Sequence, residues 1–429
     1  MLKIRKVNLL YEKEKNFTLG FSLIFHSFLS YLLYAATAST GLNVIVPLFA
    51  NENGLDQGAV LSMNTVGVLF SSFFVLISGK LILAKGIRFT TTVCAIGAGV
   101  FGFVLMGFVH TLVGFAICTL FIQGLVYGYS YTSTTTLTAN WWPRKKGIVM
   151  GITTTGIESA AFTLVPLMSF ISKNYGYFPT IWFLASILIM FGAVSWFWIR
   201  DRPEEVGLFP DNIPLTEEEY HDEYHKELSS KESQKLWNMK EIFNKKYSWL
   251  IMISYGIFTM IASGIASTTI PFAIESGFSE NAALTVLSIA CFSSIIGSII
   301  SGYCDTFFGP KKTTIYSGIW ILLAFLVLIL VSGQIGTYLF LVMVFVTMGA
   351  TGNLLASLIA DIYGRNNFTQ VFRMLYTGVY IIRGFTFVIL GVGSDLLGSY
   401  KAVYLILGVL SLFATLILLP VKYKLQYSK

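Results

Sequence analysis

The sequence contains the stretch GKLILAKGIR at Gly79–Arg88 and, in its second half, the stretch GYCDTFFGPKK at Gly302–Lys312. Each begins with a glycine, has a second glycine seven residues later and ends in basic residues, and the two copies lie 223 positions apart. The same distance relates GLDQGAVLS at 54–62 to GFSENAALT at 277–285. Loop glycines that recur at one distance predict a chain built from two similar halves.

Charged residues make up only 12% of the 429 residues, whereas hydrophobic residues make up 55%. Soluble chains carry about 25% charged residues, so this chain has too few to cover a surface exposed to water. The composition excludes a soluble enzyme, a nucleic-acid-binding domain and a disordered chain. The four cysteines lie in apolar stretches without the spacing of metal ligands or of a disulfide framework. The remaining class is an integral membrane protein.

Twelve runs are apolar enough and long enough to cross a bilayer as helices, for which about 20 residues are needed. They are too long and too uniformly apolar for the strands of a β-barrel. The runs cover residues 18–49, 58–84, 89–109, 112–138, 147–171, 177–199, 247–273, 281–306, 313–333, 337–361, 371–394 and 400–421. The sequence therefore predicts an all-α membrane protein with twelve transmembrane helices.

A polar segment, residues 201–245, separates the first six runs from the last six. It holds 12 acidic and 6 basic residues, a composition typical of a solvated linker. Together with the repeat, it predicts two pseudo-symmetric six-helix bundles, residues 1–200 and 246–429, joined by a charged cytoplasmic linker.

The positions of Lys and Arg predict the orientation. Nearly all 29 of them fall in segments on one side of the membrane if both termini are cytoplasmic. Lys173 and Lys401 fall in loops on the other side, and Arg383 lies inside a span. This asymmetry follows the positive-inside rule. We expect a multi-pass protein of the cytoplasmic membrane with both termini inside, whose basic net charge reflects topology and not nucleic-acid binding.

The chain resembles the major facilitator superfamily over essentially its whole length. The resemblance lies in the two stretches quoted above, in NWWPRKKGIVMG at Asn140–Gly151, in RDRPEEVGLFPD at Arg200–Asp211 and in DIYGR at Asp361–Arg365. Asn140–Gly151 and the PEEVGL string look most like the oxalate/formate antiporter and monocarboxylate porter branch. GLNVIVP, at 41–47, is similar to bacterial bile-acid:proton symporters. The resemblance implies a twelve-helix secondary transporter that works by alternating access.

In the superfamily, the repeated turn latches the cytoplasmic side through its glycines, an Asp and basic neighbours. The resemblance assigns this gating role to Gly79, Gly86, Arg88, Gly302, Asp305, Gly309, Lys311 and Lys312. The first copy has Ile82 or Leu83 in place of the Asp, which argues against a symmetric latch. The alternative is that the basic residues only determine topology.

Two charged residues, Glu158 and Arg383, lie deep within predicted spans. Glu158 follows Gly147 by 11 residues, about 16 Å along a helix and therefore near the membrane midplane, and Arg383 reaches a similar depth. A charge there costs about 2.5–3.5 kcal/mol on insertion scales and is retained mostly where it is used. The two are 225 positions apart, close to the repeat distance. We therefore expect equivalent places on helices 5 and 11, which the resemblance implies face each other across a central cavity.

Arg383 suits a carboxylate, because its planar guanidinium donates two parallel hydrogen bonds and stays charged. The corresponding part of helix 8, GSIISG at 297–302, lacks the second basic residue of some carboxylate transporters. One carboxylate is therefore expected. Glu158 has three interpretations: a proton-coupling residue, a partner for a substrate amine, or an internal ion pair with Arg383.

Further polar residues follow helical spacing at the expected cavity depth. His26 on helix 1 is a second candidate for proton coupling, with a structural role as the alternative. The other candidates for substrate binding are Tyr34, Gln123, Tyr127, Tyr131, Asn353, Tyr376 and Tyr380, for which the alternative is packing.

The sequence has no phosphate-binding loop, metal-ligand cluster or nucleophile elbow, so we expect no enzyme, cofactor or metal site. The first hypothesis is a transporter of a small organic anion of the monocarboxylate type, by proton symport or by exchange for a counter-anion. The alternatives are transport of bile-acid-like or amphipathic compounds, transport of amino acids or other zwitterions, and a membrane sensor without transport. A monomer in the lipid bilayer is expected.

Overall fold

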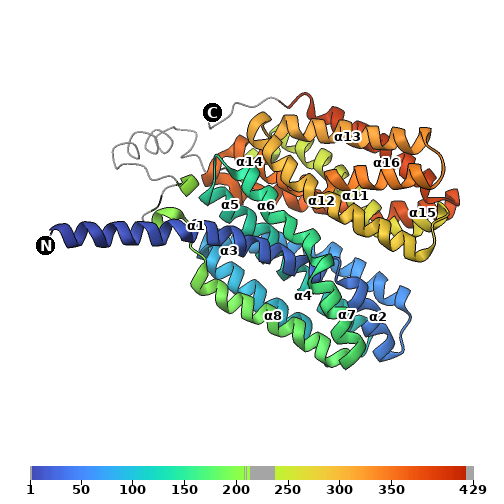
Figure 1. Cartoon of the computed structure of the whole chain (residues 1–429), viewed down its shortest axis with the longest axis horizontal. Helices are drawn as coiled ribbons and strands as arrows, with labels where there is room; N and C mark the ends of the chain where they lie inside the picture. Colours follow the sequence, from blue (N-terminus) through green and yellow to red (C-terminus); the bar gives the residue numbers. More distant parts are fainter. Residues whose placement is uncertain (1, 207, 209, 213–236, 422–429) are drawn as a thin grey trace.

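The computed structural model describes residues 2–206, 208, 210–212 and 237–421, and within them the chain is helical without strands (Figure 1). The α-helices are α1 Leu2–Ala38, α2 Leu42–Asn53, α3 Gln57–Gly97, α4 Leu112–Tyr127, α5 Thr134–Trp141, α6 Lys146–Ser159, α7 Leu164–Tyr175, α8 Tyr177–Trp198, α10 Met239–Phe243, α11 Lys246–Glu275, α12 Glu280–Phe308, α13 Pro310–Leu330, α14 Gly333–Gly384, α15 Thr386–Leu397 and α16 Tyr400–Leu418. The shorter helical turns are η1 Ala98–Val104, η2 Gly128–Ser133, η3 Ala160–Phe162, η4 Pro203–Val206 and η5 Pro210–Asn212.

Ten of these helical stretches are long and apolar enough to span a membrane. Two of them are interrupted by a glycine with positive φ, Gly86 in α3 (φ 88°) and Gly364 in α14 (φ 74°). An L-residue with a side chain rarely adopts such a φ, so glycine allows the chain to turn there within one residue. Dividing both stretches at these glycines gives twelve spans. The prediction of an all-α membrane protein with twelve spans is therefore confirmed.

The helices form two bundles, with α1 to α8 in one and α11 to α16 in the other (Figure 1). Across the boundary, α6 packs against α12, and α3, α5 and α6 pack against α14. Central residues 213–236 of the predicted linker lie outside the described residues.

The repeat is visible in the backbone. Gly86 and Gly309 have nearly the same conformation, with φ of 88° and 85°. At the other end of the preceding helix, Gly54 and Gly277 both have positive φ. Two residues after each, a side chain caps a helix: Asp56 accepts from the amide of Ala59, and Ser279 from that of Ala282. Matching caps and turns explain why these short polar positions repeat in otherwise apolar sequence.

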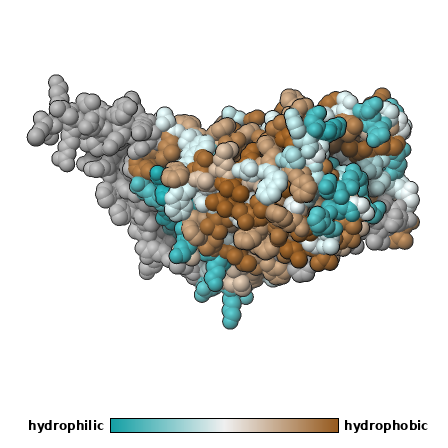
Figure 2. All heavy atoms as spheres, turned by 90° about the horizontal axis from the view of Figure 1, so that it is seen from below, coloured by the Kyte–Doolittle hydropathy of each residue, from teal (hydrophilic) through white to brown (hydrophobic). Residues whose placement is uncertain are grey.

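The outer surface fits a lipid environment. Large apolar side chains such as Ile77, Phe108 and Phe197 are more than half exposed. Figure 2 shows a broad hydrophobic area in the middle of one face, with hydrophilic residues toward both ends. Water would not tolerate an apolar area of this size on a monomer, whereas hydrocarbon does.

The segment after α8 ties down two helix starts at one end of the first bundle. Asp201 accepts hydrogen bonds from the amides of Ile87 and Arg88, at 2.9 and 2.8 Å. Asp211 accepts from the amides of Arg144 and Lys145, at 3.1 and 2.9 Å. Burial raises the pKa of Asp211, and these two amides oppose the shift. Two carboxylates ten residues apart thus cap the start of the third span, which follows Gly86 within α3, and the start of the fifth span, α6.

Candidate functional site

Six tyrosines from three helices meet where the two bundles touch. Tyr31 and Tyr34 belong to α1, Tyr127 and Tyr131 to α4 and η2, and Tyr376 and Tyr380 to α14. Their rings form a continuous cluster: Tyr131 lies edge-on to Tyr34 at 5.0 Å and stacks on Tyr376 at 5.6 Å, and Tyr127 lies edge-on to Tyr380 at 4.7 Å. Five of the six were predicted from their helical spacing. Tyr31, edge-on to Tyr131 at 5.3 Å, was missed, although it precedes Tyr34 by one helical turn.

A π-helical turn positions two of these rings. The α-helix α4 ends at Tyr127, and η2 begins at Gly128. A side chain at Gly128 would come within 2.8 Å of the Cys94 sulfur, so the glycine permits this close contact with α3. Tyr127 and Tyr131 stack with their ring centres 5.2 Å apart. π-Helical turns are rare and often occur at functional sites.

Arg383 lies against this tyrosine cluster. Its Nη1 donates to the Tyr127 hydroxyl at 2.9 Å, and its Cζ lies 5.3 Å from the centre of the Tyr380 ring. The Tyr127 hydroxyl is in turn 2.7 Å from that of Tyr34. Within the described residues no carboxylate forms an ion pair with Arg383. A guanidinium has five N–H donors, so most of them remain available to an anion.

Glu158 has different neighbours. Its Oε1 accepts a hydrogen bond from Ser294 of α12 at 3.3 Å, and the Cys291 thiol also interacts with it. The side chain is half-buried on the contact between α6 and α12. The structure therefore does not pair Glu158 with Arg383, which is bound to tyrosines instead.

Helices 5 and 11, which were expected to face each other across a central cavity, take part in different contacts between the bundles. Helix 5 (α6) packs against helix 8 (α12), and helix 11 (365–384 of α14) packs against helix 2 (57–85 of α3). We call the first contact the Glu158 seam, and we call the second contact, together with the tyrosine cluster beside it, the Arg383 seam. In the Glu158 seam, a side chain on Gly151 would lie 3.0 Å from the Cα of Gly302. Such small residues let two helices approach closely.

The other predicted site residues lie inside the helix packing. Gln123 donates to the carbonyl of Ala38 at 2.9 Å, at the end of α1. Asn353 donates to Ser298 at 3.2 Å and to the carbonyl of Gly349 at 3.1 Å. Neither residue is among the contacts of Arg383.

His26 lies within the first bundle, away from both seams. Its Nε2 is 2.8 Å from the Ser195 hydroxyl, which itself donates to the carbonyl of Phe191. Because that hydroxyl proton is already used, Nε2 is the donor, and Nδ1 has no hydrogen-bond partner among the described residues. The ring also stacks on Phe191 at 4.9 Å. This placement favours the structural alternative for His26.

The first copy of the repeated turn makes contacts mainly within its own bundle. Arg88 donates to the carbonyl of Ile199 at 3.3 Å and lies 5.4 Å from the Trp196 ring centre. Gly79, by contrast, lies against Arg373 of the other bundle: a side chain there would come within 2.7 Å of the Arg373 Cβ.

In the second copy, Asp305 is 4% exposed and lies against Gly147. Lys311 donates to the carbonyl of Leu419 at 2.8 Å, away from the first bundle, and Lys312 is exposed. Asp305 and Gly302 of this copy lie at the boundary between the bundles, against Gly147, where an ionic latch would have to be.

Two ion pairs that the sequence analysis missed join the bundles at this end. Lys146 of α6 pairs with Asp361 of α14, and both are less than a tenth exposed. Arg365 forms a two-pronged pair with Glu204, with N–O distances of 2.8 and 3.0 Å. We call these two pairs the cytoplasmic latch, because the positive-inside rule predicts that this end of the molecule faces the cytoplasm. Asp361 lies four residues before Arg365 in the DIYGR motif. Its partner, Lys146, follows helix 4 of the first bundle, so the spacing of residues along one helix could not predict the pair.

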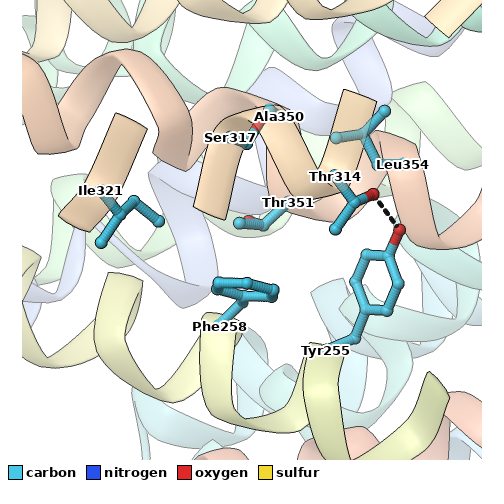
Figure 3. A pocket seen from close by; sticks show the side chains of 8 residues that line it. All are labelled: Tyr255, Phe258, Thr314, Ser317, Ile321, Ala350, Thr351 and Leu354. Carbon is cyan, nitrogen blue, oxygen red and sulfur yellow. Dashed lines mark hydrogen bonds between the residues drawn. The ribbon is translucent and has the colours of Figure 1, made fainter. Parts of the chain in front are cut away.

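A small cavity lies elsewhere, inside the second bundle between α11, α13 and α14 (Figure 3). Phe258 and Leu354 line it, and the Tyr255 hydroxyl at its edge is 2.5 Å from that of Thr314. Neither Arg383 nor Glu158 reaches it, so it is not the candidate site.

Known proteins resemble this chain in sequence family and in fold. The family model described as Major Facilitator Superfamily matches residues 27–386. The transporter FucP in its outward conformation covers 94% of this chain and 98% of its own at 14% identity, with a TM-score of 0.66. The human organic anion transporter MFSD10 (TETRAN) covers 95% and 99% at 14% identity (TM-score 0.65). The proton:xylose symporter XylE covers 94% and 95% at 14% identity (TM-score 0.75). No curated protein sequence matches the chain.

Proposed function

The chain belongs to the major facilitator superfamily of membrane transporters, and we propose that it carries a small organic anion of the monocarboxylate type by alternating access. Sites in such transporters lie near the membrane midplane between the two bundles. The proposed binding group is Arg383, and the proposed substrate surface is the tyrosine cluster around it.

The observation that carries this proposal is a deep arginine held by hydroxyl groups and not by a carboxylate. An uncompensated cation at this depth is unfavourable, and a bound carboxylate would neutralise it through charge-assisted hydrogen bonds. Because Arg383 donates to the Tyr127 oxygen, the Tyr127 hydroxyl can donate a hydrogen bond to Tyr34, and the Tyr34 hydroxyl can then donate to the anion.

Glu158 is the proposed proton-coupling residue. It lies at a similar depth but on the other seam, with hydroxyl and thiol neighbours that suit a carboxyl able to gain and lose a proton. Its separation from the Arg383 contacts argues against one small zwitterion bound by both. Proton symport is therefore favoured, and exchange for a counter-anion is the alternative coupling mode.

A second candidate substrate is an amphipathic, bile-acid-like anion. The observation that favours it is the extent of the cluster, since ring contacts continue from Tyr376 to Phe372 and Phe368 at 5.0 and 5.2 Å. Such a row of rings offers apolar area to a large ligand.

We further propose a monomer whose bundles, 1–200 and 246–429, move relative to each other about linker 201–245. Both termini would lie on the cytoplasmic side, where the Lys and Arg residues gather. The repeated turns and the cytoplasmic latch would close that side.

The test is uptake into proteoliposomes that contain the purified chain, with labelled monocarboxylates of increasing size, a dicarboxylate, an amino acid, a bile acid and a hexose. We expect one carboxylate class to be taken up and Arg383→Gln to abolish that uptake. Arg383→Lys is the matched control, because it keeps the charge but not the planar fork. Uptake of the hexose alone, or uptake that survives Arg383→Gln, would refute the proposal.

A further inference from the structure

A line of polar side chains leads from Glu158 toward the cytoplasmic latch along the contacts of α6, α12 and α14. On each helix its members recur at four- or seven-residue spacing and so share one face. They are Thr154 and Glu158 on α6, Ser294, Ser298 and Asp305 on α12, and Asn353, Ser357 and Asp361 on α14.

The upper part of the line is connected by hydrogen bonds. Ser294 donates to Glu158 at 3.3 Å. One turn further, the hydroxyls of Thr154 and Ser298 are 2.7 Å apart, and the Asn353 amide donates to Ser298 at 3.2 Å. All three helices therefore meet at the Ser298 hydroxyl.

The lower part ends at Asp305. Ser357 is its hydroxyl neighbour, and the charged groups that face it are Lys146 from α6 and Asp361 from α14. On α13, Lys311 binds the carbonyl of Leu419. Lys146 already pairs with Asp361, so an ionised Asp305 would add an uncompensated negative charge to a buried cluster. A proton on Asp305 would balance the charges.

Three buried polar atoms along this line lack a hydrogen bond of good geometry within the described residues: Asn353 Oδ1, Ser357 Oγ and Asp305 Oδ2, the last two belonging to neighbouring side chains. An unsatisfied buried acceptor costs about 1–3 kcal/mol, and buried groups of this kind are usually satisfied by ordered water. The three atoms lie on consecutive turns of α14 and at its contact with Asp305, which is where a short chain of water would have to be.

We propose that this line is a hydrated proton path that connects Glu158 to Asp305 and, through it, to the cytoplasm. The inference rests on the proposed role of Glu158 in proton coupling. One O–H bond breaks at Glu158 and one forms at Asp305, while the intervening hydroxyls and waters each receive one proton and release one. Asp305 then holds the proton while the latch is closed and releases it when Lys146 and Asp361 separate.

The experiment compares two transport modes in proteoliposomes, with the labelled monocarboxylate that shows the strongest Arg383-dependent uptake. Uptake driven by a pH gradient requires proton release on each cycle, whereas exchange of label for unlabelled substrate at equal pH does not. Ser357→Val places methyl groups in the path, and Ser357→Thr restores the hydroxyl. Thr347→Ala, on the same helix, is the matched control, since its hydroxyl bonds only the carbonyl of Val344.

We expect Ser357→Val to slow gradient-driven uptake at least tenfold, to leave exchange within about twofold, and to be rescued by Ser357→Thr. Asp305→Asn should show the same separation of modes. Equal loss of both modes, or no loss of either, would overturn the path. The role of Glu158 is tested separately by Glu158→Gln: if that variant still couples uptake to the pH gradient, the proposed function fails at Glu158. If it uncouples while Ser357→Val does not, only the path fails.

Discussion

The Glu158 seam and the Arg383 seam are equivalent contacts between the two halves, yet the side chains that line them differ. The Glu158 seam is lined by glycine, serine and threonine, and its helices approach until backbone meets backbone. The Arg383 seam carries large rings and an arginine. A repeated backbone thus supplies two similar contacts, and side-chain size decides which one can hold a ligand. We interpret the aromatic seam as the substrate surface and the small-residue seam as the route for protons.

The largest effect is expected when the charges of Glu158 and Arg383 are exchanged. In the double variant Glu158→Arg/Arg383→Glu, uptake should stay abolished, because the two residues have separate partners and the reversal restores neither. Loss of a buried charged contact costs about 2–5 kcal/mol, enough to remove measurable uptake. Recovery in the double variant but not in either single variant would show an ion pair between them.

A large effect on stability is expected at the cytoplasmic latch, which joins α6 to α14. Asp361→Asn breaks the buried ion pair with Lys146 and leaves Asp305 as the carboxyl group that faces Lys146; breaking a buried pair costs about 3–5 kcal/mol. Thermal unfolding in detergent should show a clearly lower Tm. Lys146→Met/Asp361→Leu, which removes both charges, should recover most of it; a double variant no more stable than Asp361→Asn would contradict this account.

A smaller difference should separate matched glycines of the two seams. A side chain at Gly302 would meet the backbone of Gly147 at 2.6 Å, whereas one at Gly79 would meet the Arg373 side chain. Backbone cannot move aside as a side chain can, so Gly302→Ala should lose about 1–3 kcal/mol of stability and Gly79→Ala less. Unfolding curves of the two variants, measured side by side, check the order, and the reverse order would show that the Arg373 side chain is the more rigidly held.

Within the Arg383 seam, Tyr127→Phe should act mainly on affinity. The variant keeps the ring contacts and removes the hydroxyl to which Arg383 donates. A hydrogen bond to a charged group is worth about 1.5–3 kcal/mol, part of which a bound anion would replace. We expect KM to rise about tenfold with little change in maximal rate, and an unchanged KM would place the substrate elsewhere.

The smallest effect is expected away from both seams. His26→Gln should leave the pH profile of uptake unchanged, because His26 packs between α1 and α8 and contacts neither seam. The profile is measured beside that of Glu158→Gln. A shift in the His26→Gln profile would restore a proton-coupling role for this histidine.

The sequence predicted what depends on local chemistry. Apolar run length gave the spans, and i, i+4 spacing found Tyr127, Tyr131, Tyr376 and Tyr380. It failed where the answer depends on which helices are neighbours across the two bundles. Equivalent positions in a repeat are related by symmetry, which does not require contact, so the matching places of Glu158 and Arg383 do not predict whether the two residues pair.

The latch was missed for a related reason. Lys146 and Asp361 are 215 positions apart, and each alone fits a topology signal or a helix end. Lys146 belongs to α6 and Asp361 to α14, two helices that pack against each other across the boundary between the bundles. No residue pattern within one helix predicts such a contact between helices.

The π-helical turn η2 at Gly128–Ser133 also bears on how this chain tolerates length changes. Each of its i→i+5 hydrogen bonds spans one more residue than an i→i+4 hydrogen bond of an α-helix does. Deletion of a single residue there would let helix 4 close into a regular α-helix, and the residues after the turn would keep their orientation because the π-turn has already absorbed the extra residue. Tyr131, which lies within the turn, would leave the ring of Tyr376, while the span would still cross the membrane. A one-residue insertion is thus a small genetic step by which a packing helix can acquire a binding surface.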